Sequence, residues 1–232
     1  MENILSIQSL HKHYPGFALE NVSFSLAPNR IMGLIGKNGA GKSTTLKAIL
    51  NMVSPESGNV TMFQKNFYQH EKECKQRIGV VFGGIDFYPL KKLSDIAAVT
   101  QKFYKNWDQE QYQKYIKRFA LEESKNFKEL SNGMKVKYLL ALALSHHAEL
   151  LILDEPTRGV DIGAKKEIYS IINDLAAKGV AIIMVSSELP EVLGMSDRVM
   201  VVREGLVRGF LSKEEANQEN IMILATGGNL NE

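Results

Sequence analysis

The chain has 232 residues and a formal net charge of +2, with 44% hydrophobic and 23% charged residues. This length predicts one large domain, or a domain with an inserted lobe. The near-neutral charge argues against a nucleic-acid-binding protein. The single cysteine, Cys74, excludes an internal disulfide. The N-terminus lacks a signal-peptide pattern, and no apolar run approaches the roughly 18 residues of a membrane span. We therefore expect a cytosolic protein that attaches to a membrane only through a partner.

Strand and helix patterns alternate along most of the chain. The first two predicted strands form an antiparallel pair. Between Leu93 and about His147, the apolar residues recur at the spacing of an α-helix. The alternation predicts an α/β fold with a mainly parallel sheet and helices on both faces. Strands are predicted at 4–10, 18–26, 30–35, 60–63, 78–82, 150–153, 180–185 and 198–202, and helices at 43–52, 95–103, 108–119, 134–144, 164–177 and 188–195.

The segment from Gly36 to Ser43 reads Gly-Lys-Asn-Gly-Ala-Gly-Lys-Ser, a complete phosphate-binding loop between a predicted strand and helix. Glycines let the backbone turn tightly and direct N–H groups at phosphates. Lys42 is predicted to reach the β- and γ-phosphates, and the Ser43 hydroxyl to bind Mg²⁺. The sequence therefore predicts a nucleoside triphosphate site. Its predicted residues are Gly36, Lys37, Asn38, Gly39, Ala40, Gly41, Lys42, Ser43 and Thr44.

A second motif is the apolar strand at 150–153, which ends in Asp154 and Glu155. A carboxylate in this place is what a P-loop enzyme uses to hold Mg²⁺, directly or through water, so Asp154 is the second predicted metal ligand. Glu155 is placed to orient or deprotonate the attacking water. A strand that ends in Asp-Glu can also be purely structural, but its pairing with the phosphate loop favours catalysis.

Upstream, Leu130-Ser131-Asn132-Gly133-Met134 opens a helix. Here nearly the whole chain resembles the nucleotide-binding subunits of ABC transporters, whose signature is usually Leu-Ser-Gly-Gly-Gln. Ser131 can cap the helix, and the Gly133 backbone can approach a phosphate at its positive end. The resemblance implies ATP as the nucleotide and a head-to-tail homo- or heterodimer with a second ATPase subunit. In such a dimer, Ser131 and Gly133 contact the nucleotide held by the opposite subunit.

The same resemblance implies an architecture and a partner. The fold would be a P-loop NTPase: one domain over residues 1–232 with a RecA-like core, an N-terminal antiparallel β region and an inserted helical lobe at about 84–146. The partner would be an integral membrane permease subunit that holds the chain on the cytoplasmic face of the membrane. The transported substrate and the direction of transport do not follow from the sequence.

Two further residues match the family. Tyr14 stands where the family places an aromatic ring that stacks on adenine, although a strand tyrosine can instead pack on the core. Asp161, in Arg-Gly-Val-Asp, matches the loop that crosses the dimer interface.

The chain departs from the family at two positions near the γ-phosphate. Gly83 replaces a Gln that senses Mg²⁺ and the attacking water, and Ser187 replaces a His that contacts the γ-phosphate. The signature also lacks its final Gln. Because these groups act in the transition state, we expect intact ATP binding and reduced hydrolysis. Gln at position 83 and His at position 187 are then expected to raise the rate.

The two halves resemble different relatives. Up to about Pro156, the signature and Phe103-Tyr-Lys-Asn-Trp107-Asp resemble the short ATPases of bacterial ABC-2-type exporters. From Thr157 onward, the chain resembles the second ATPase cassette of ribose-type sugar importers, which carries Ser-Ser-Glu at the His position. We hypothesise that the chain is a mosaic of the two.

An apolar segment follows Gly83. Phe87, Tyr88 and Leu90 stand where the family docks a cytosolic helix of the membrane subunit, and burial within their own lobe is the alternative. Two other functions stay open. One is a module that dimerises with ATP and hydrolyses little, and the other is a soluble ABC ATPase with no role in transport.

Overall fold

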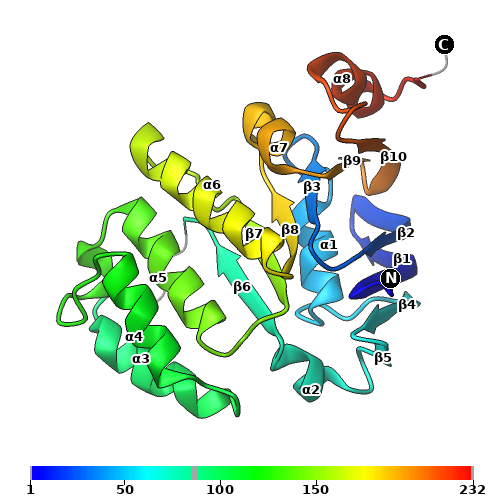
Figure 1. Cartoon of the computed structure of the whole chain (residues 1–232). Helices are drawn as coiled ribbons and strands as arrows, with labels where there is room; N and C mark the ends of the chain where they lie inside the picture. Colours follow the sequence, from blue (N-terminus) through cyan, green and yellow to red (C-terminus); the bar gives the residue numbers. More distant parts are fainter. Residues whose placement is uncertain (1, 85–87, 231–232) are drawn as a thin grey trace. The chain divides into compact units, whose positions relative to one another are not determined.

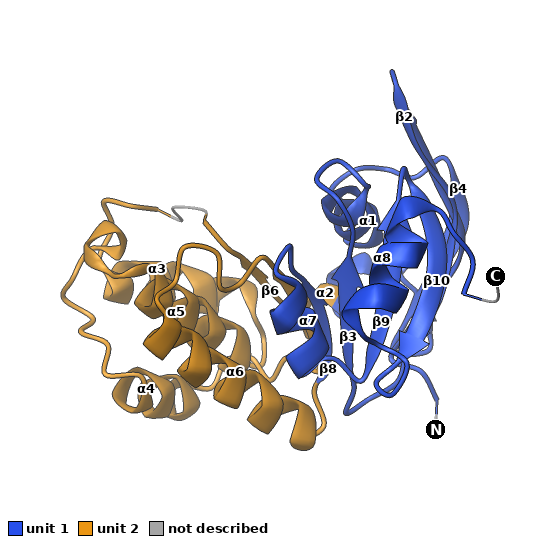
Figure 2. Cartoon of the chain, turned by 90° about the horizontal axis from the view of Figure 1, so that it is seen from above, with its two compact units in different colours: residues 1–74, 181–232 blue, residues 75–180 orange. Residues whose placement is uncertain are grey.

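The computed structural model describes residues 2–84 and 88–230. The chain divides into two compact units, coloured separately in Figure 2. The first consists of residues 1–74 and 181–232, and the second of residues 75–180. Figure 1 labels the elements of both.

The first unit contains an antiparallel sheet with the strand order β2-β1-β4-β5. The strands are β1 (Leu5–Tyr14), β2 (Phe17–Leu26), β4 (Ser57–Met62) and β5 (Lys65–Asn66). β1 and β2 form a hairpin, in which Leu5 pairs with Leu26 and Tyr14 with Phe17. The predicted antiparallel N-terminal β region is therefore confirmed.

The second sheet of this unit has the strand order β10-β9-β3-β8. β3 (Ile31–Ile35) runs parallel to β8 (Ala181–Val185) and to β9 (Arg198–Arg203), and β10 (Leu206–Ser212) is antiparallel to β9. Every residue of β3 and β8 is buried, as expected for central strands of an α/β sheet. The helices of this unit are α1 (Lys42–Ile49), α7 (Leu189–Met195) and α8 (Gln218–Thr226).

The chain passes into the second unit at α2 (Glu71–Lys75), and this unit is built around the parallel strands β6 (Ile78–Phe82) and β7 (Leu150–Asp154). Helix α5 packs closely on β6, because a Cβ at Gly79 would lie 2.7 Å from the Cβ of Ala143. The helices are α3 (Leu93–Thr100), α4 (Gln109–Arg118), α5 (Asn132–Leu144) and α6 (Ile162–Ala177), with 3₁₀ turns at η1 (Gln101–Phe103) and η2 (Phe127–Glu129).

The parallel pairs and intervening helices confirm the predicted α/β class. The predicted lobe helices at 95–144 are α3, α4 and α5, and they share the second unit with β6, β7 and α6. The short elements β5, α2, β10 and α8 did not emerge from the sequence patterns. Among the residues that the structure describes, none of the helices is long and apolar enough to span a bilayer.

Candidate nucleotide-binding site

The phosphate loop joins β3, which ends at Ile35, to α1, which begins at Lys42, as the sequence predicts. Gly39 and Gly41 have φ angles of 80° and 110°, in the left-handed region that glycine adopts without strain. No side chain caps α1 within the described residues. The N–H groups of a helix's first turn have no partner inside the helix, so this end is suited to bind an anion.

The turn between β9 and β10 anchors the loop. The N–H of Gly205 donates to the carbonyl oxygen of Ala40 at 2.8 Å. A Cβ at Gly36 would lie 2.1 Å from the carbonyl oxygen of Val202, so only glycine fits there. These contacts hold the loop against the turn between β9 and β10. The sequence interpretation missed Gly205, although the Glu-Gly pair between two apolar runs is a turn signal.

Lys42 is almost fully buried, with 7% of its surface exposed. Its Nζ donates to the carbonyl oxygens of Gly36 at 2.7 Å and Lys37 at 3.2 Å. The ammonium group is therefore held against the loop backbone. Thr45, which the sequence interpretation did not select, is buried and donates through Oγ1 to the Gly41 carbonyl at 2.9 Å.

The remaining predicted loop residues differ in exposure. Lys37, Asn38, Gly39 and Ser43 are exposed, Gly36 and Thr44 are half-buried, and Ala40 and Gly41 are buried. The exposed residues form the rim of the loop, and the buried ones pack under it.

Tyr14 ends β1 and belongs to the same unit as the loop. It is 39% exposed, and Lys12 Nζ lies 5.5 Å from its ring centroid. Its cross-strand partner, Phe17, reaches Gly41: a Cβ there would lie 2.9 Å from Phe17 Cζ. Tyr14 does not pack in the core, and its contact with adenine stays a prediction.

In the second unit, Asp154 ends β7 opposite Phe82 of β6, and both Asp154 and Glu155 are half-buried. Glu155 has a φ of 50°. The left-handed region is unfavourable for a residue with a side chain, and such strain clusters at functional sites. The N–H of Arg158 donates to the Glu155 carbonyl at 3.2 Å, which closes a tight turn after the strand.

The structure corrects the expectation for Gly83. Its N–H donates to the Asp154 carbonyl at 2.7 Å, and a Cβ at this position would lie 1.8 Å from the carbonyl oxygen of Glu155. Any side chain here would force the backbone to move. This steric contact, which the sequence does not contain, argues against the expectation that Gln at position 83 raises the rate.

Ser187 follows β8 and is exposed, so a larger side chain has room there. The residue before it, Ser186, is fully buried and connects the segment to the phosphate-loop strand through its N–H, which lies 3.4 Å from the carbonyl oxygen of Leu34. The Ser186 hydroxyl donates to the buried carboxylate of Glu191 and accepts from the Glu188 N–H at 3.0 Å. The sequence interpretation missed this pair, although Ser186 directly follows an apolar strand.

The signature residues form the expected helix cap. Ser131 Oγ accepts from the Met134 N–H at 3.3 Å, at the start of α5. A Cβ at Gly133 would lie 2.8 Å from the Ala164 Cβ, so packing on α6 also requires glycine. Asn132 donates to the Gly159 carbonyl at 2.9 Å, which links the signature to the loop that ends at Asp161. Asp161 Oδ1 accepts from the Ala164 N–H at 2.9 Å and caps α6.

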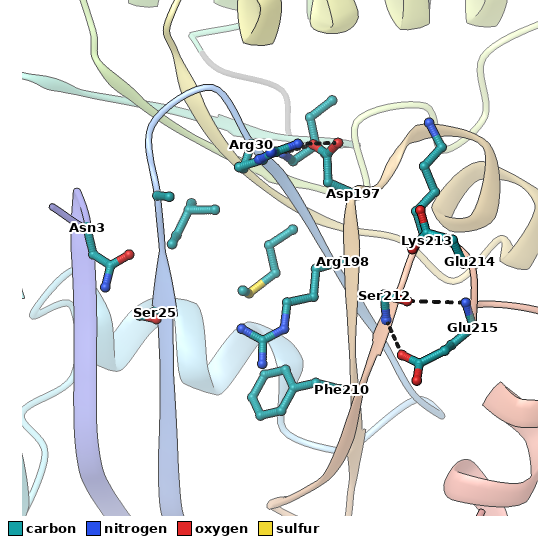
Figure 3. Close-up of a pocket in the computed structure, with 14 residues that line it drawn as sticks. Asn3, Ser25, Arg30, Asp197, Arg198, Phe210, Ser212, Lys213, Glu214 and Glu215 are labelled. Carbon is teal, nitrogen blue, oxygen red and sulfur yellow. Dashed lines mark hydrogen bonds and ion pairs between the residues drawn. The ribbon is translucent and has the colours of Figure 1, made fainter. Parts of the chain in front are cut away.

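A cavity of about 610 Å³ lies at the opposite end of β3, near Arg30 (Figure 3). Arg30 pairs there with Asp197 at 3.4 Å, and the Arg198 guanidinium lies 4.1 Å from the Phe210 ring centroid. The Ser212 N–H donates to Glu215 at 2.9 Å. Arg30 and Asp197 thus pair with each other, whereas the partners of Arg198 and Glu215 are uncharged. Since the phosphate loop follows the other end of β3, this cavity is separate from it.

The candidate Mg²⁺ ligands are the Ser43 hydroxyl and the Asp154 carboxylate. Ser43 lies in the first unit and Asp154 in the second, and each offers a hard oxygen donor of the kind that Mg²⁺ prefers. Within residues 2–84 and 88–230, no group of three or more His, Cys, Asp or Glu side chains forms a separate metal site.

A protein-family model described as "ABC transporter" matches residues 19–158. The Ribose import ATP-binding protein RbsA of Bacillus cereus is 41% identical over 225 residues, which cover 90% of this chain and 45% of that protein. The protein of the same name from Lactococcus lactis subsp. cremoris is 36% identical over 225 residues, with 90% and 46% covered. The chain spans about half the length of these curated relatives. The similarity to these ribose import proteins covers 90% of the chain, so it is not confined to the part after Thr157.

Two solved structures share the fold. One, described as the ATP binding subunit of an ABC transporter, has a TM-score of 0.82 and 22% identity, and the match covers 98% of this chain and 96% of that one. The other, cbiO1 from Clostridium perfringens, described as part of the ABC transporter complex cbiONQ, has a TM-score of 0.80 and 24% identity, with 96% and 94% covered. The TM-scores and the coverage establish the shared fold, and the predicted P-loop NTPase class is confirmed. The family model matches more than half of the residues of this chain, and the chain therefore belongs to the ABC transporter family.

Proposed function

We propose that this chain is the ATP-binding subunit of an ABC transporter and that it binds and hydrolyses MgATP. The observation that carries the proposal is the geometry of the phosphate loop. Gly39 and Gly41 take left-handed conformations, α1 begins without a side-chain cap, and the buried Lys42 ammonium lies against the loop carbonyls. A loop of this form binds the phosphates of a nucleotide.

Each site residue has a proposed role. The loop backbone and Lys42 bind the phosphates, Tyr14 stacks on adenine, and Glu155 orients or deprotonates the attacking water. Ser43 and Asp154 are the proposed Mg²⁺ ligands. The metal, when bound, would neutralise charge on the phosphate oxygens. Most of the catalytic effect in phosphoryl transfer comes from such positioning and charge stabilisation.

The second ATPase subunit is the proposed partner of the signature. Ser131 and Asn132 are exposed at the start of α5, and Arg158 and Gly159 are exposed beside them. The hydrogen bond from Asn132 to Gly159 joins the two segments into one surface. This surface supports a head-to-tail dimer in which Ser131 and Gly133 contact the opposite subunit's ATP and Asp161 lies at the interface.

A permease subunit is the proposed membrane partner. Tyr88, Leu90, Val99 and Phe103 are 56%, 69%, 50% and 70% exposed. All except Leu90 border a cavity of about 510 Å³ beside α3. Apolar surface of this kind marks a contact with another protein or with a membrane. The exposure of Tyr88 and Leu90 argues against burial in their own lobe, whereas Phe87 lies outside the described residues. We propose that this contact holds the chain at the cytoplasmic face of the membrane.

The transported substrate is proposed to be ribose or a similar sugar, and the direction import. The names of the Bacillus cereus and Lactococcus lactis relatives support this choice. The exporter-like features of the first half, and the mosaic hypothesis built on them, remain hypotheses.

A second candidate function is an ATP-gated dimerisation module with little hydrolysis of its own. Gly83 and Ser187 favour it, because Gly83 has no side chain to sense Mg²⁺ and the attacking water, and Ser187 lacks the imidazole that contacts the γ-phosphate in the family. The retained Glu155 favours hydrolysis. The third candidate, an ABC ATPase without a role in transport, gives no reason for the exposed apolar surface at Tyr88, Leu90 and Phe103.

Thermal unfolding with and without MgATP tests the proposal. A ligand at 100 times its Kd stabilises a folded protein by about 2.7 kcal/mol, so saturating MgATP should raise the Tm of the wild type. Lys42→Ala should abolish this shift. Lys47→Ala is the matched control, because Lys47 lies on the same helix but is exposed. If Lys42→Ala and Lys47→Ala respond to MgATP alike, the proposed site is wrong.

A further inference from the structure

Tyr14, the residue proposed to stack on adenine, lies at an end of β1 that extends past one of its neighbouring strands. β1 pairs with β2 on one side and with β4 on the other (Figure 1). The pairing with β2 continues as far as Tyr14, which lies opposite Phe17. On the other side, β4 begins only at Ser57, which lies opposite His11. The β4 side of the Tyr14 end is therefore not held by the strand itself.

Glu56, the residue before β4, continues the contact with β1. Its own N–H donates to the His11 carbonyl at 2.9 Å, and its side-chain Oε1 accepts from the His13 N–H at 3.1 Å. Its Oε2 lies 2.5 Å from Nδ1 of the His13 ring. The hydrogen bond from the His13 side chain, followed by the one from its N–H, lowers the pKa of Glu56, so the carboxylate is ionised at neutral pH and can only accept. One carboxylate thus binds both the backbone and the side chain of the residue next to Tyr14.

The same carboxylate also reaches Lys12. Lys12 Nζ lies 3.8 Å from Oε1 of Glu56 and 5.5 Å from the centroid of the Tyr14 ring. Residues i and i+2 of a strand point to the same face of a sheet, so these two side chains lie side by side. An ammonium group over an aromatic ring is attracted to the face of that ring. Glu56 is therefore linked to Tyr14 in two ways, through the adjoining backbone of His13 and through the side chain of Lys12.

We propose that Glu56 is a positioning residue for Tyr14: its carboxylate fixes the end of β1 so that the tyrosine ring is presented to the base of the nucleotide. This inference rests on the proposed function, in which Tyr14 stacks on adenine. The ring is accessible, since Tyr14 is 39% exposed. Its cross-strand partner Phe17 reaches the phosphate loop, where a Cβ at Gly41 would lie 2.9 Å from Phe17 Cζ. The end of the hairpin that Glu56 holds thus adjoins the loop that binds the phosphates.

Glu56 is not part of the phosphate loop, so it should matter for the base and not for the phosphates. Calorimetric titration of the full chain with MgATP and with the magnesium salt of inorganic tripolyphosphate separates the two, because tripolyphosphate has neither base nor sugar. Tyr14→Ala should weaken MgATP binding about fivefold or more, the loss typical of removing one base stack. Glu56→Ala should weaken it by about two- to fivefold, the range of an exposed ion pair. Tripolyphosphate binding should stay unchanged in both variants.

Three further variants sharpen the test. Glu56→Gln keeps an oxygen that can accept from the His13 N–H but carries no charge, so its loss of MgATP affinity should be smaller than that of Glu56→Ala. Glu20→Ala is the matched control, because it removes an exposed glutamate from β2 of the same hairpin, and it should bind both ligands like the wild type. Glu56→Ala combined with Tyr14→Ala should bind MgATP like Tyr14→Ala alone, because Glu56 acts through the ring that is then missing.

The readout is the ratio of the MgATP affinity to the tripolyphosphate affinity, because a general distortion of the fold would weaken both. A ratio that falls in Tyr14→Ala but keeps its wild-type value in Glu56→Ala would overturn the positioning role and leave the proposed nucleotide site intact. A double variant in which the two single losses multiply would overturn it as well. An unchanged ratio in Tyr14→Ala would instead contradict the proposed contact with adenine, and this inference with it.

Discussion

Gly83 and Glu155 are in steric contact through their backbones. A Cβ at Gly83 would lie 1.8 Å from the carbonyl oxygen of Glu155, while the Gly83 N–H donates to the Asp154 carbonyl at 2.7 Å. Glu155 itself has a φ of 50°. The position of the proposed catalytic carboxylate therefore depends on the absence of a side chain at position 83. Glycine here is a structural requirement as well as a departure from the family's Gln.

Gly83→Ala is expected to destabilise the protein and to reduce ATP hydrolysis more than tenfold, because the backbone of Asp154 and Glu155 must move to admit a Cβ. Gly84→Ala is the matched control. No described atom lies within 4 Å of a Cβ there, although its φ of 73° adds a strain of roughly 1–2 kcal/mol. Urea unfolding and ATPase rates measure both variants. Similar ATPase rates in the two would show that the contact does not matter for hydrolysis.

Ser187→His is expected to raise the ATPase rate, since it restores a polar group at an exposed position after β8. A preorganised donor is typically worth about 3 kcal/mol in the transition state, or roughly a hundredfold in rate. We expect a smaller gain, because the surroundings are not shaped around an imidazole. Steady-state ATPase assays compare it with Ser187→Ala, which should stay near the wild-type rate. An unchanged rate in Ser187→His, with MgATP binding intact, would show that the missing His does not limit turnover.

His146 should make stability depend on pH. Burial lowers its pKa to about 4 in the folded protein, against about 6.5 when unfolded. Between these values the unfolded chain binds a proton that the folded chain does not, so stability falls as the pH drops below about 6.5. At about 1.4 kcal/mol per pH unit, the loss between pH 7 and pH 5 is about 2 kcal/mol.

The control for this prediction is His146→Phe, which cannot titrate at position 146. Urea unfolding at pH 7 and pH 5 gives the free energy of unfolding for both proteins. The difference between wild type and variant should change by about 2 kcal/mol, in the direction that favours the variant at pH 5. A difference that is the same at both pH values would mean that His146 is protonated in the folded protein.

The elements that depend on local sequence signals could be predicted from the sequence. The phosphate loop and the strands β6 and β7 could be predicted almost to the residue, because glycine spacing and buried apolar runs are local signals. The Ser131 cap could be predicted for the same reason. β10 and α8 could not, since their stability depends on packing of Leu211, Ile221 and Leu224 against β9.

The contacts that shape the site are not local. The Gly205 N–H donates to the Ala40 carbonyl, although these residues are far apart in the sequence and belong to no common motif. The burial of Ser186 beside Glu191 likewise follows from the fold. The Gly83–Glu155 contact is of the same kind. A pattern search finds residues that carry chemistry, whereas the residues that position them become visible only in three dimensions.

The most direct test of the proposed ATPase is Glu155→Gln, which removes the carboxylate that activates water and retains the size of the side chain. Calorimetric titration should show MgATP binding close to that of the wild type, in contrast to Lys42→Ala. Hydrolysis should fall to background, and light scattering should show an ATP-bound dimer that accumulates. Hydrolysis at the wild-type rate in Glu155→Gln would contradict the proposed mechanism, and a complete loss of MgATP binding would contradict the assignment of Glu155 to catalysis.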